Sequence, residues 1–409
     1  MIMTIIEALT IGLGLSYAAA LLHASQHHYG ALTLMSTLAA ALLIANQATL
    51  WLTVTLAITL VAALHRSRWG ENWLTQVDPQ RLRVLCQHTL ALSMLVVAAQ
   101  YGIHLWFLGQ GLTPPLPRPD VVDAFLPIAG GLGLRGAIET GHLDHHHPAA
   151  MVMLTVVLLG GLLFKRAFCG WVCPLGLAGE YLHRLGDRLL PARRNVPPRL
   201  DGPLRMIKYV LASALVYVVA LALPTMALPG YLKSSYHIMA DVKMAQFFVE
   251  PGTLTLLMGT GLIVASMWRR QAFCRYLCPY GALMGLLSLL SPLKIQRQSD
   301  HCLINSKGLA CDKCSRACPA GIAVHQQTRI HSDECQACLR CISACPKRAQ
   351  ALALSLPNQR KVSANGLFVL LVITLLLLPL IAHLAGTWHS ETDPLIRIQL
   401  IQMLDSLGM

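Results

Sequence analysis

The chain is poor in charged, acidic and aromatic residues. Only 12% of its 409 residues are Asp, Glu, Lys or Arg, and 19 acidic residues stand against 32 basic ones. A soluble domain of this length needs a more polar surface, so the composition excludes an ordinary soluble protein. The sequence also lacks a Cys-x2-Cys-His run, which excludes a covalently attached c-type haem. What fills the chain instead is apolar, with 55% hydrophobic residues.

Long apolar runs predict membrane-spanning helices. At 1.5 Å per residue, about 20 residues cross the roughly 30 Å of hydrocarbon in a bilayer. We expect eight spans, the first of them a retained helix rather than a signal peptide, because no basic residue precedes it. The runs lie near 5–22, 31–46, 47–64, 84–107, 149–164, 206–224, 252–268 and 365–386.

The basic residues gather in alternate loops. The segments 65–83, 165–208, 269–297 and 307–361 together hold 27 of the 32 Lys and Arg residues. Cytoplasmic loops carry such an excess, so we expect these segments in the cytoplasm. The N-terminus, the loops 108–148 and 225–251 and the tail after 387 would then face the periplasm of a bacterium. The positive charge therefore indicates topology in a lipid membrane, and we expect no nucleic-acid partner.

One stretch, 293–362, has no membrane-length apolar run but contains eight of the 13 cysteines. Its second half reads CQACLRCISACP from Cys335 to Pro346, the bacterial ferredoxin run for a [4Fe-4S] cluster. Its first half reads CDKCSRACP from Cys311 onward. Gly308 stands where the regular spacing requires another cysteine, and Cys302 lies six residues further back. A longer loop would let Cys302 supply the missing thiolate.

In double-cluster ferredoxins, three closely spaced cysteines bind one cluster and the fourth, distant cysteine binds the other. Zinc knuckles or disulfides are the alternatives. Disulfides are disfavoured in a reducing cytoplasm, and zinc does not call for two Cys-x3-Cys-Pro endings. We therefore expect two [4Fe-4S] clusters that relay electrons. One would be held by Cys302, Cys311, Cys314 and Cys345, and the other by Cys318, Cys335, Cys338 and Cys341.

Two further segments are near copies of each other: FCGWVCPLG at 168–176 and FCRYLCPYG at 273–281. Each follows a pair of expected spans joined by an external loop, so both emerge on the same face. A parallel repeat would place the copies around an axis along the membrane normal. That axis would bring together four cysteines at a central metal or redox site: Cys169, Cys173, Cys274 and Cys278.

Several kinds of chemistry suit four convergent thiols. They could hold a third iron-sulfur cluster, bind copper or form redox-active disulfides. They could also be small buried side chains that pack beside the glycines of the motifs. A bound metal or protonation must neutralise them in a low-dielectric membrane, and we expect an iron-sulfur centre rather than copper.

The phrases RAFCGWVCPLG and QAFCRYLCPYGALMG, followed by SPLKIQR and the double ferredoxin run, carry a family resemblance. The chain resembles polyferredoxin-type membrane proteins related to the membrane quinol dehydrogenase subunit of periplasmic nitrate reductase systems. The membrane part of the nitrous oxide reductase regulator and the cytochrome oxidase assembly cupric reductase share this arrangement. The resemblance covers about residues 84–362. It implies a membrane electron carrier that links quinol or a cytoplasmic donor to an acceptor across the bilayer.

The chain departs from these relatives in three ways. Where relatives often carry a Cys-Pro pair in the first external loop, this sequence reads DAFLPI at 123–128. Gly308 replaces the regular cysteine, which leaves the ligands of one cluster open. No flavin-binding domain precedes the membrane part, so we expect electrons from another protein or from quinol.

Two external segments carry further candidate ligands. The segment 141–147 reads GHLDHHH, which could bind a divalent metal, accept protons from quinol or form a solvated loop. The equivalent loop of the other copy contains Tyr236, His237, Asp241 and Lys243. A quinol pocket could therefore form between the two loops.

We expect an all-α polytopic membrane protein with a parallel internal repeat and a small cytoplasmic α+β ferredoxin domain, in the inner membrane of a bacterium. Its function is electron transfer of the quinol dehydrogenase type, with a cytoplasmic donor or a periplasmic acceptor protein as redox partner. The alternative is an assembly factor that binds and reduces copper at the central cysteines. The expected units are N-terminal helices (1–83), repeat 1 (84–190), repeat 2 (191–292), the ferredoxin domain (293–362) and a C-terminal helix with its tail (363–409).

Overall fold

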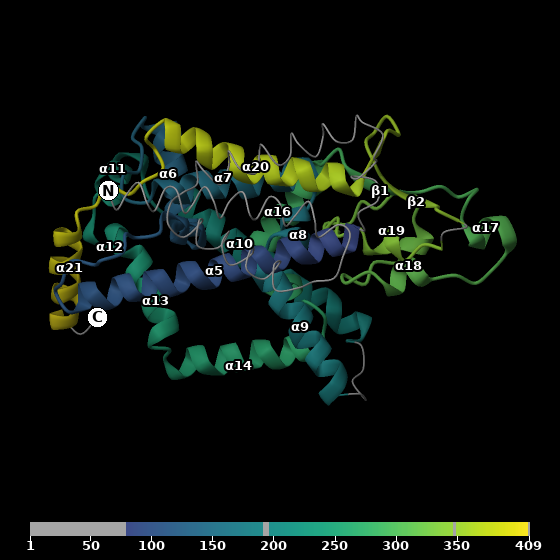
Figure 1. Cartoon of the computed structure of the whole chain (residues 1–409), viewed down its shortest axis with the longest axis horizontal. Helices are drawn as coiled ribbons and strands as arrows, with labels where there is room; N and C mark the ends of the chain where they lie inside the picture. The colour runs from purple at the N-terminus through teal and green to yellow at the C-terminus, as the bar shows by residue number, and fades with distance from the viewer. Residues whose placement is uncertain (1–78, 191–195, 347–348, 408–409) are drawn as a thin grey trace, which may run out of the picture.

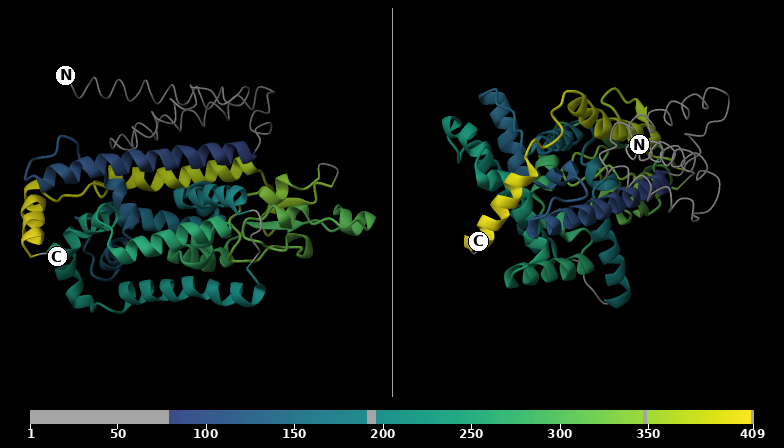
Figure 2. Two further views of the ribbon diagram at one scale, coloured as in Figure 1. Left: turned by 90° about the horizontal axis from the view of Figure 1, so that it is seen from below. Right: turned by 60° about the vertical axis from the view of Figure 1, so that its left-hand side comes forward.

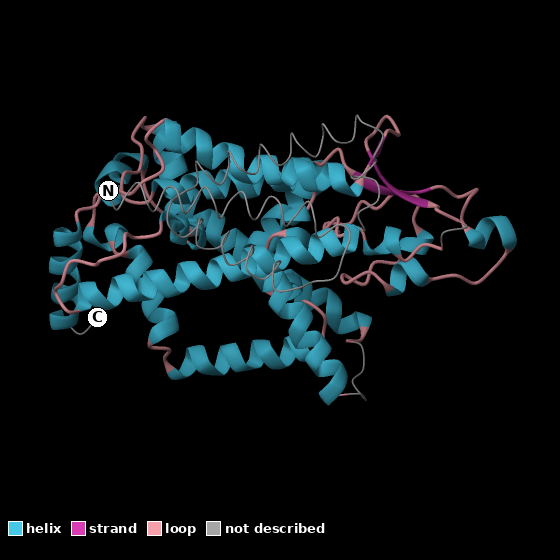
Figure 3. Ribbon diagram, viewed as in Figure 1, coloured by secondary structure: helices cyan, strands magenta, loops and turns pink. Residues whose placement is uncertain are grey.

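The computed structural model describes residues 79–190, 196–346 and 349–407, which form an elongated, mostly helical molecule (Figures 1 and 3). Three helices of this part are long and apolar enough to cross a membrane. A fourth span results if two helices that meet at a bend of 72° count as one. The three are α5 (Pro79–Gly109), α10 (Pro198–Ala220) and α20 (Ala364–Leu384), and the bent pair is α13 (Ala240–Val249) with α14 (Thr253–Trp268).

The eight expected spans are thus matched only in part. The runs at 5–22, 31–46 and 47–64 lie outside the described residues. The run at 149–164 forms α7 (Pro148–Phe164), whose 17 residues are too few for an upright crossing, and α14 has 16 residues. The described part is therefore a membrane protein with three or four spans by length and composition.

Two copies of one unit form the centre of the molecule, each a helix, a five-residue helix and a second helix. In both copies the second cysteine of the motif occupies the N-cap position of the second helix, and proline takes the first helical position, where no N–H is needed. Helix α16 packs on α7 while α14 packs on α9, a reciprocal exchange of the kind that a twofold relation produces. The copies are α7, α8 (Ala167–Trp171) and α9 (Pro174–Leu189), and α14, α15 (Ala272–Tyr276) and α16 (Pro279–Leu290).

The long helices run between two ends that differ in content (Figures 1 and 2). We call one the loop end, because it gathers the connecting segments and the C-terminal helix. It contains η1 (Asp120–Phe125), α6 (Pro127–Glu139), η2 (Thr225–Ala227), α11 (Leu228–Leu232), α12 (Ser235–Ile238) and α21 (Pro394–Leu407). The other, the cysteine end, contains all the strands of the described residues (Figure 3).

At the cysteine end, an antiparallel sheet of order β1-β2-β3 pairs Lys294 with Ser355 and Leu354 with Val362. Its buried side chains, such as Ile295 and Leu354, share one core with Trp171 of α8. The ferredoxin region is therefore packed onto the helices rather than tethered to them. Its elements are β1 (Lys294–Arg297), α17 (Leu303–Lys307), α18 (Lys313–Arg316), η3 (Val324–Gln326), α19 (Arg340–Ser343), β2 (Leu352–Ser355) and β3 (Lys361–Val362).

Candidate functional site

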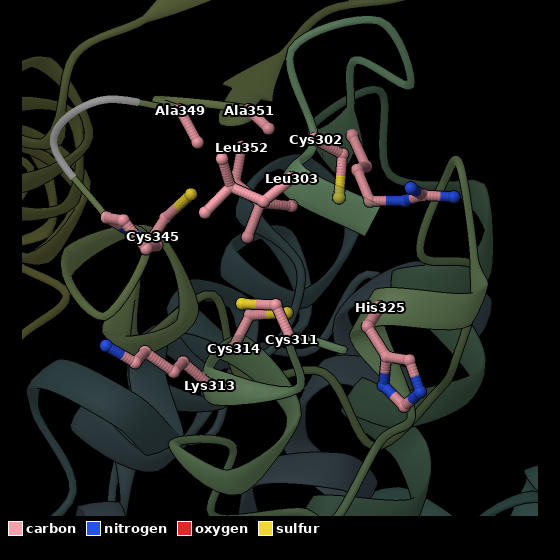
Figure 4. A pocket seen from close by; sticks show the side chains of 12 residues that line it. Cys302, Leu303, Cys311, Lys313, Cys314, His325, Cys345, Ala349, Ala351 and Leu352 are labelled. Atoms are coloured by element: carbon pink, nitrogen blue, oxygen red, sulfur yellow. The ribbon is translucent and has the colours of Figure 1, made fainter. Parts of the chain in front are cut away.

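Four cysteines surround a cavity beside α17, which forms the tip of the cysteine end (Figure 1). Figure 4 shows their sulfur atoms directed into a common space. Three come from the first motif, and the fourth comes from the end of the second motif, after α19. We call Cys302, Cys311, Cys314 and Cys345 the outer set.

A short helix accommodates the irregular spacing before Cys311. Cys302 occupies the N-cap of α17, and the helix ends at Gly308, which adopts a left-handed conformation with φ of 62° that glycine tolerates. The chain then doubles back, so Cys302 reaches the cavity. Gly308 does not line the cavity, and a Cβ built there would meet no heavy atom within 4 Å.

The remaining four cysteines of the region line a second cavity. We call Cys318, Cys335, Cys338 and Cys341 the inner set. Its walls are mainly apolar, with Ile295, Val324 and Ile330 among them. Burial raises the pKa of Cys318 to about 11, so its thiolate needs a bound cation at neutral pH. Two sets of four cysteines, each around one cavity, suit [4Fe-4S] clusters, which take four thiolates each.

The inner set lies directly against the central helices. The indole Nε1 of Trp171 donates to the carbonyl of Ala337 at 3.0 Å, between two cysteines of the set. The absence of a side chain at Gly170 allows the close approach, because a Cβ there would lie 2.7 Å from the carbonyl oxygen of Gln336. The ferredoxin region is thereby attached beside the motif FCGWVCPLG.

The central cysteines lie close to one another, as the repeat predicts. Cys169 and Cys274 are buried, and the thiols of Cys173, Cys274 and Cys278 each lie near enough to other central cysteines for their charges to interact. The Sγ of Cys169 is also 3.9 Å from the Sδ of Met284. Among the described residues, no three His, Cys, Asp or Glu side chains converge tightly enough to hold a single metal ion.

A buried cation accompanies these thiols. The guanidinium of Arg166 is fully buried, and its charge lies near Cys169 and Cys274. Its Nε has no hydrogen-bond partner within the described part of the chain. A buried donor beside four thiols suits a bound anionic sulfur group, so the central residues fit an iron-sulfur centre.

At the loop end, acids and bases neutralise one another in a buried network. Asp241 accepts from Nε of Arg118 and from Nη1 of Arg397, both at 2.7 Å. Arg118 also pairs with Asp123, which lies 3.0 Å from Nδ1 of His147. Burial alone would lower the pKa of His147, but Asp123 and Asp241 raise it above its ordinary value.

The histidines of the segment 141–147 do not form one site. His237 from the equivalent loop lies 2.8 Å from Asp144, so the two loops do meet, as expected from the repeat. Burial opposes the effect, yet His237 and nearby groups lower the pKa of Asp144. His147 joins the same pair, because its Nε2 lies 2.9 Å from the carbonyl oxygen of His237 while its Nδ1 contacts Asp123. The other histidines have separate partners: His142 contacts Thr140, His145 Glu391 and His146 Thr392.

Sequence reasoning missed Arg166, Glu334 and the partners Arg118 and Arg397. Arg166 had a signal, because it immediately precedes Ala-Phe-Cys in the first copy where the second copy has Gln271. A charge that breaks an otherwise matched repeat is a candidate for a function of its own. The two arginines at the loop end had no comparable signal for the partner that they share, since Asp241 is distant from both in sequence.

Comparisons with known proteins agree with this arrangement. Residues 146–193 and 251–298 both match the family of the 4Fe-4S binding domain, and residues 294–346 match the 4Fe-4S dicluster domain. The chain is 38% identical over 297 residues to the "Putative electron transport protein YccM" of Escherichia coli, covering 71% of this chain and 81% of the relative. No solved structure matches the chain.

The chain also matches two more distant relatives. The ferredoxin-type protein NapH of Escherichia coli is 25% identical over 296 residues, which cover 69% of this chain and 90% of NapH. Protein NirI of Paracoccus denitrificans is 30% identical over 294 residues, covering 67% of this chain but only 40% of NirI. With two matches to one cluster-binding family, a dicluster region and apolar spans, the chain belongs to the polyferredoxin family of [4Fe-4S] membrane electron transport proteins that includes YccM, NapH and NirI.

Proposed function

We propose that the protein carries electrons between a partner at the cysteine end and an acceptor at the loop end, with one [4Fe-4S] cluster in the outer set and one in the inner set. The sorting of eight cysteines into two fours, each around one cavity, carries the proposal. The fourth cysteine of each motif lines the other motif's cavity, as in double-cluster ferredoxins. Bound there, the clusters would supply reversible one-electron oxidation and reduction.

The proposal is tested by metal analysis and EPR on protein purified without oxygen. We expect at least about eight iron atoms per chain with matching sulfide, because each cluster holds four. Reduction by dithionite should produce EPR signals of two interacting clusters. Fewer than about four iron atoms in a folded preparation would contradict the proposal.

At the central cysteines we propose a third iron-sulfur centre, supported by their proximity and by the unpartnered Nε of Arg166. The wild type would then contain about twelve iron atoms. The double variant Cys169→Ser/Cys274→Ser should retain about eight. About eight in both proteins would mean that no iron lies at the centre.

A copper-reducing assembly factor is the second candidate, because Met284 places a thioether beside Cys169. Thiolates and thioethers are soft ligands that favour Cu(I). This function predicts stoichiometric copper that is lost in Met284→Leu, whereas an iron-sulfur centre predicts iron that remains in that variant.

We propose a bacterial inner-membrane topology with eight spans, a parallel repeat and a cytoplasmic ferredoxin domain at 293–362. The excess of Lys and Arg in alternate loops supports it. Reporter fusions after residues 147 and 346 should report opposite compartments. The same compartment for both would overturn the topology.

We further propose that the redox partners are quinol or a cytoplasmic donor on one side and a periplasmic acceptor protein on the other. The buried carboxylates and histidines of the loop end could receive the protons that quinol releases. Anaerobic addition of a quinol to the oxidised protein should reduce its clusters, as followed by EPR. No reduction by quinol would leave a cytoplasmic protein as the donor.

A further inference from the structure

The two copies of the repeat hold the same short segment of the ferredoxin region from opposite sides. Nη1 of Arg166, in the first copy, donates to Oε2 of Glu334 at 3.2 Å. Gln271, at the matching position of the second copy, accepts from Nε2 of Gln336 at 2.6 Å. Glu334 and Gln336 flank Cys335 in the chain. Cys335, a member of the inner set, is therefore clamped between the copies.

Arg166 also faces the central cysteines. Its Nη2 lies 3.4 Å from the carbonyl oxygen of Cys274, and its charge lies near the thiols of Cys169 and Cys274. A Cβ at Gly281 would lie 2.8 Å from Nη2, so glycine makes room for the guanidinium there. One buried side chain thus contacts the central motifs and the residue next to Cys335.

The charges at this junction are unequal between the copies. Glu334 pairs with Arg166 and with the buried Lys208, while Lys165 lies near Cys335 and donates from Nζ to the carbonyl of Ile330. At the position that matches Arg166, the second copy has a neutral amide, Gln271, although its Arg275 also lies near Glu334. The charge that differs between the two matched positions is therefore that of Arg166.

We propose that Arg166 is a positioning residue that joins the inner set to the central cysteines and raises the reduction potential at Cys335, whereas Gln271 positions without changing the potential. The inference rests on the proposed function, since it needs a cluster in the inner set. A cation near a cysteine ligand favours the reduced state of a cluster, which carries the more negative charge, and a nearby anion disfavours it. Low dielectric in the buried junction strengthens both effects.

The experiment is a redox titration of the purified protein monitored by EPR, with iron quantified in each sample. We expect Arg166→Gln, which copies the matching position, to lower the midpoint potential of the inner-set cluster. Glu334→Gln should raise it, because Arg166 and Lys208 lose their counter-charge. Arg166→Lys should remain closer to the wild type than Arg166→Gln does. Gln271→Ala removes a contact without removing a charge, so it measures the effect of loosening the junction alone. Arg135→Gln, on α6 at the loop end, is the control and should leave the potential unchanged.

Arg166→Gln and Glu334→Gln are expected to shift the midpoint potential in opposite directions. This separates the proposed role from a merely structural one, because loosening the junction would shift the potential in the same direction in both variants. If Arg166→Gln fails to retain iron, the midpoint potentials of Glu334→Gln and Arg166→Lys test the inference without it. Shifts of one sign in all variants, or none in proteins with wild-type iron, would overturn the inference while the proposed function stands. A wild type without iron would instead overturn the proposed function.

Discussion

The two ends of the molecule differ in the side chains that they gather. At the loop end, Asp241 is buried between Arg118 and Arg397, and Asp123 between Arg118 and His147. At the cysteine end, eight thiols surround two cavities instead. Charges that pair with each other within the chain stabilise the fold, whereas thiols grouped around a cavity are suited to binding a metal centre.

The two cavities of the cysteine end also differ from each other. All four cysteines of the outer set are partly exposed, whereas the inner set includes the buried Cys335 and contacts the central helices through Trp171. In the proposed function, the outer set would exchange electrons with the partner at the cysteine end and the inner set with the membrane part. The following predictions test the contrast between the ends.

The largest effect is expected from Cys302→Ser. It should remove about four iron atoms and leave the inner set intact, because only the outer set uses this loop. Adding Gly308→Cys restores the regular spacing, but Gly308 does not line the cavity, so the double variant should not regain iron. Iron analysis and EPR check both. Unchanged iron content in Cys302→Ser would show that Cys302 is not a ligand of the outer-set cluster. Recovery of iron in the double variant would show that a cysteine at position 308 can serve as that ligand.

At the loop end, Asp241→Asn should be strongly destabilising without changing iron content. It leaves the buried Arg397 without its counter-ion and removes one of the three carboxylates that pair with Arg118, and breaking a buried pair costs about 3–5 kcal/mol. Asp393→Asn is the control, because Asp393 is exposed and caps a turn that asparagine can also cap. Thermal unfolding in detergent measures the difference. Equal stability of the two variants would mean that the loop-end network contributes little.

Gly170→Ala should loosen the contact between the inner set and the central helices. The new methyl group would overlap the backbone of Gln336, and such overpacking typically costs about 1–3 kcal/mol. Gly160→Ala meets nothing within 4 Å and improves helix propensity, so it should be neutral or stabilising by up to about 1 kcal/mol. Limited proteolysis of the ferredoxin region compares the variants. Identical digestion would argue against close docking.

The smallest effect is a pH dependence of stability from the loop end. His147 has a raised pKa in the folded protein, so its contribution is complete below its ordinary value of about 6.5 and is lost as pH rises through the raised value. The unfolding temperature should therefore fall over this range, more steeply than in His147→Gln. His145→Gln, at an exposed position, should keep the wild-type slope. Equal slopes in all three proteins would contradict the prediction.

The helical membrane character, the apolar runs of the described spans and the eight ferredoxin cysteines could be predicted from the sequence, because they depend on local composition and spacing. The proximity of the central cysteines also followed from the repeat. The span count stays a prediction, because three of the eight runs lie outside the described residues and α7 and α14 are shorter than the other spans. The break between α13 and α14 falls at Pro251-Gly252, which the sequence indicates, but the angle of 72° depends on packing.

The sequence by itself determined the metal-binding chemistry of the ferredoxin region, because ligand type and spacing are local. Few alternatives satisfy a complete Cys-x2-Cys-x2-Cys-x3-Cys-Pro run that follows a second Cys-x2-Cys-x3-Cys-Pro run. Only the tertiary structure decided which residues join the parts. Arg166 meets Glu334 across 168 positions, and Arg118 meets Asp241 across 123. Such pairs leave no periodic trace, since a buried charge is stabilised by whatever partner folding brings within reach. Only the tertiary structure therefore shows which charged side chains surround Cys335.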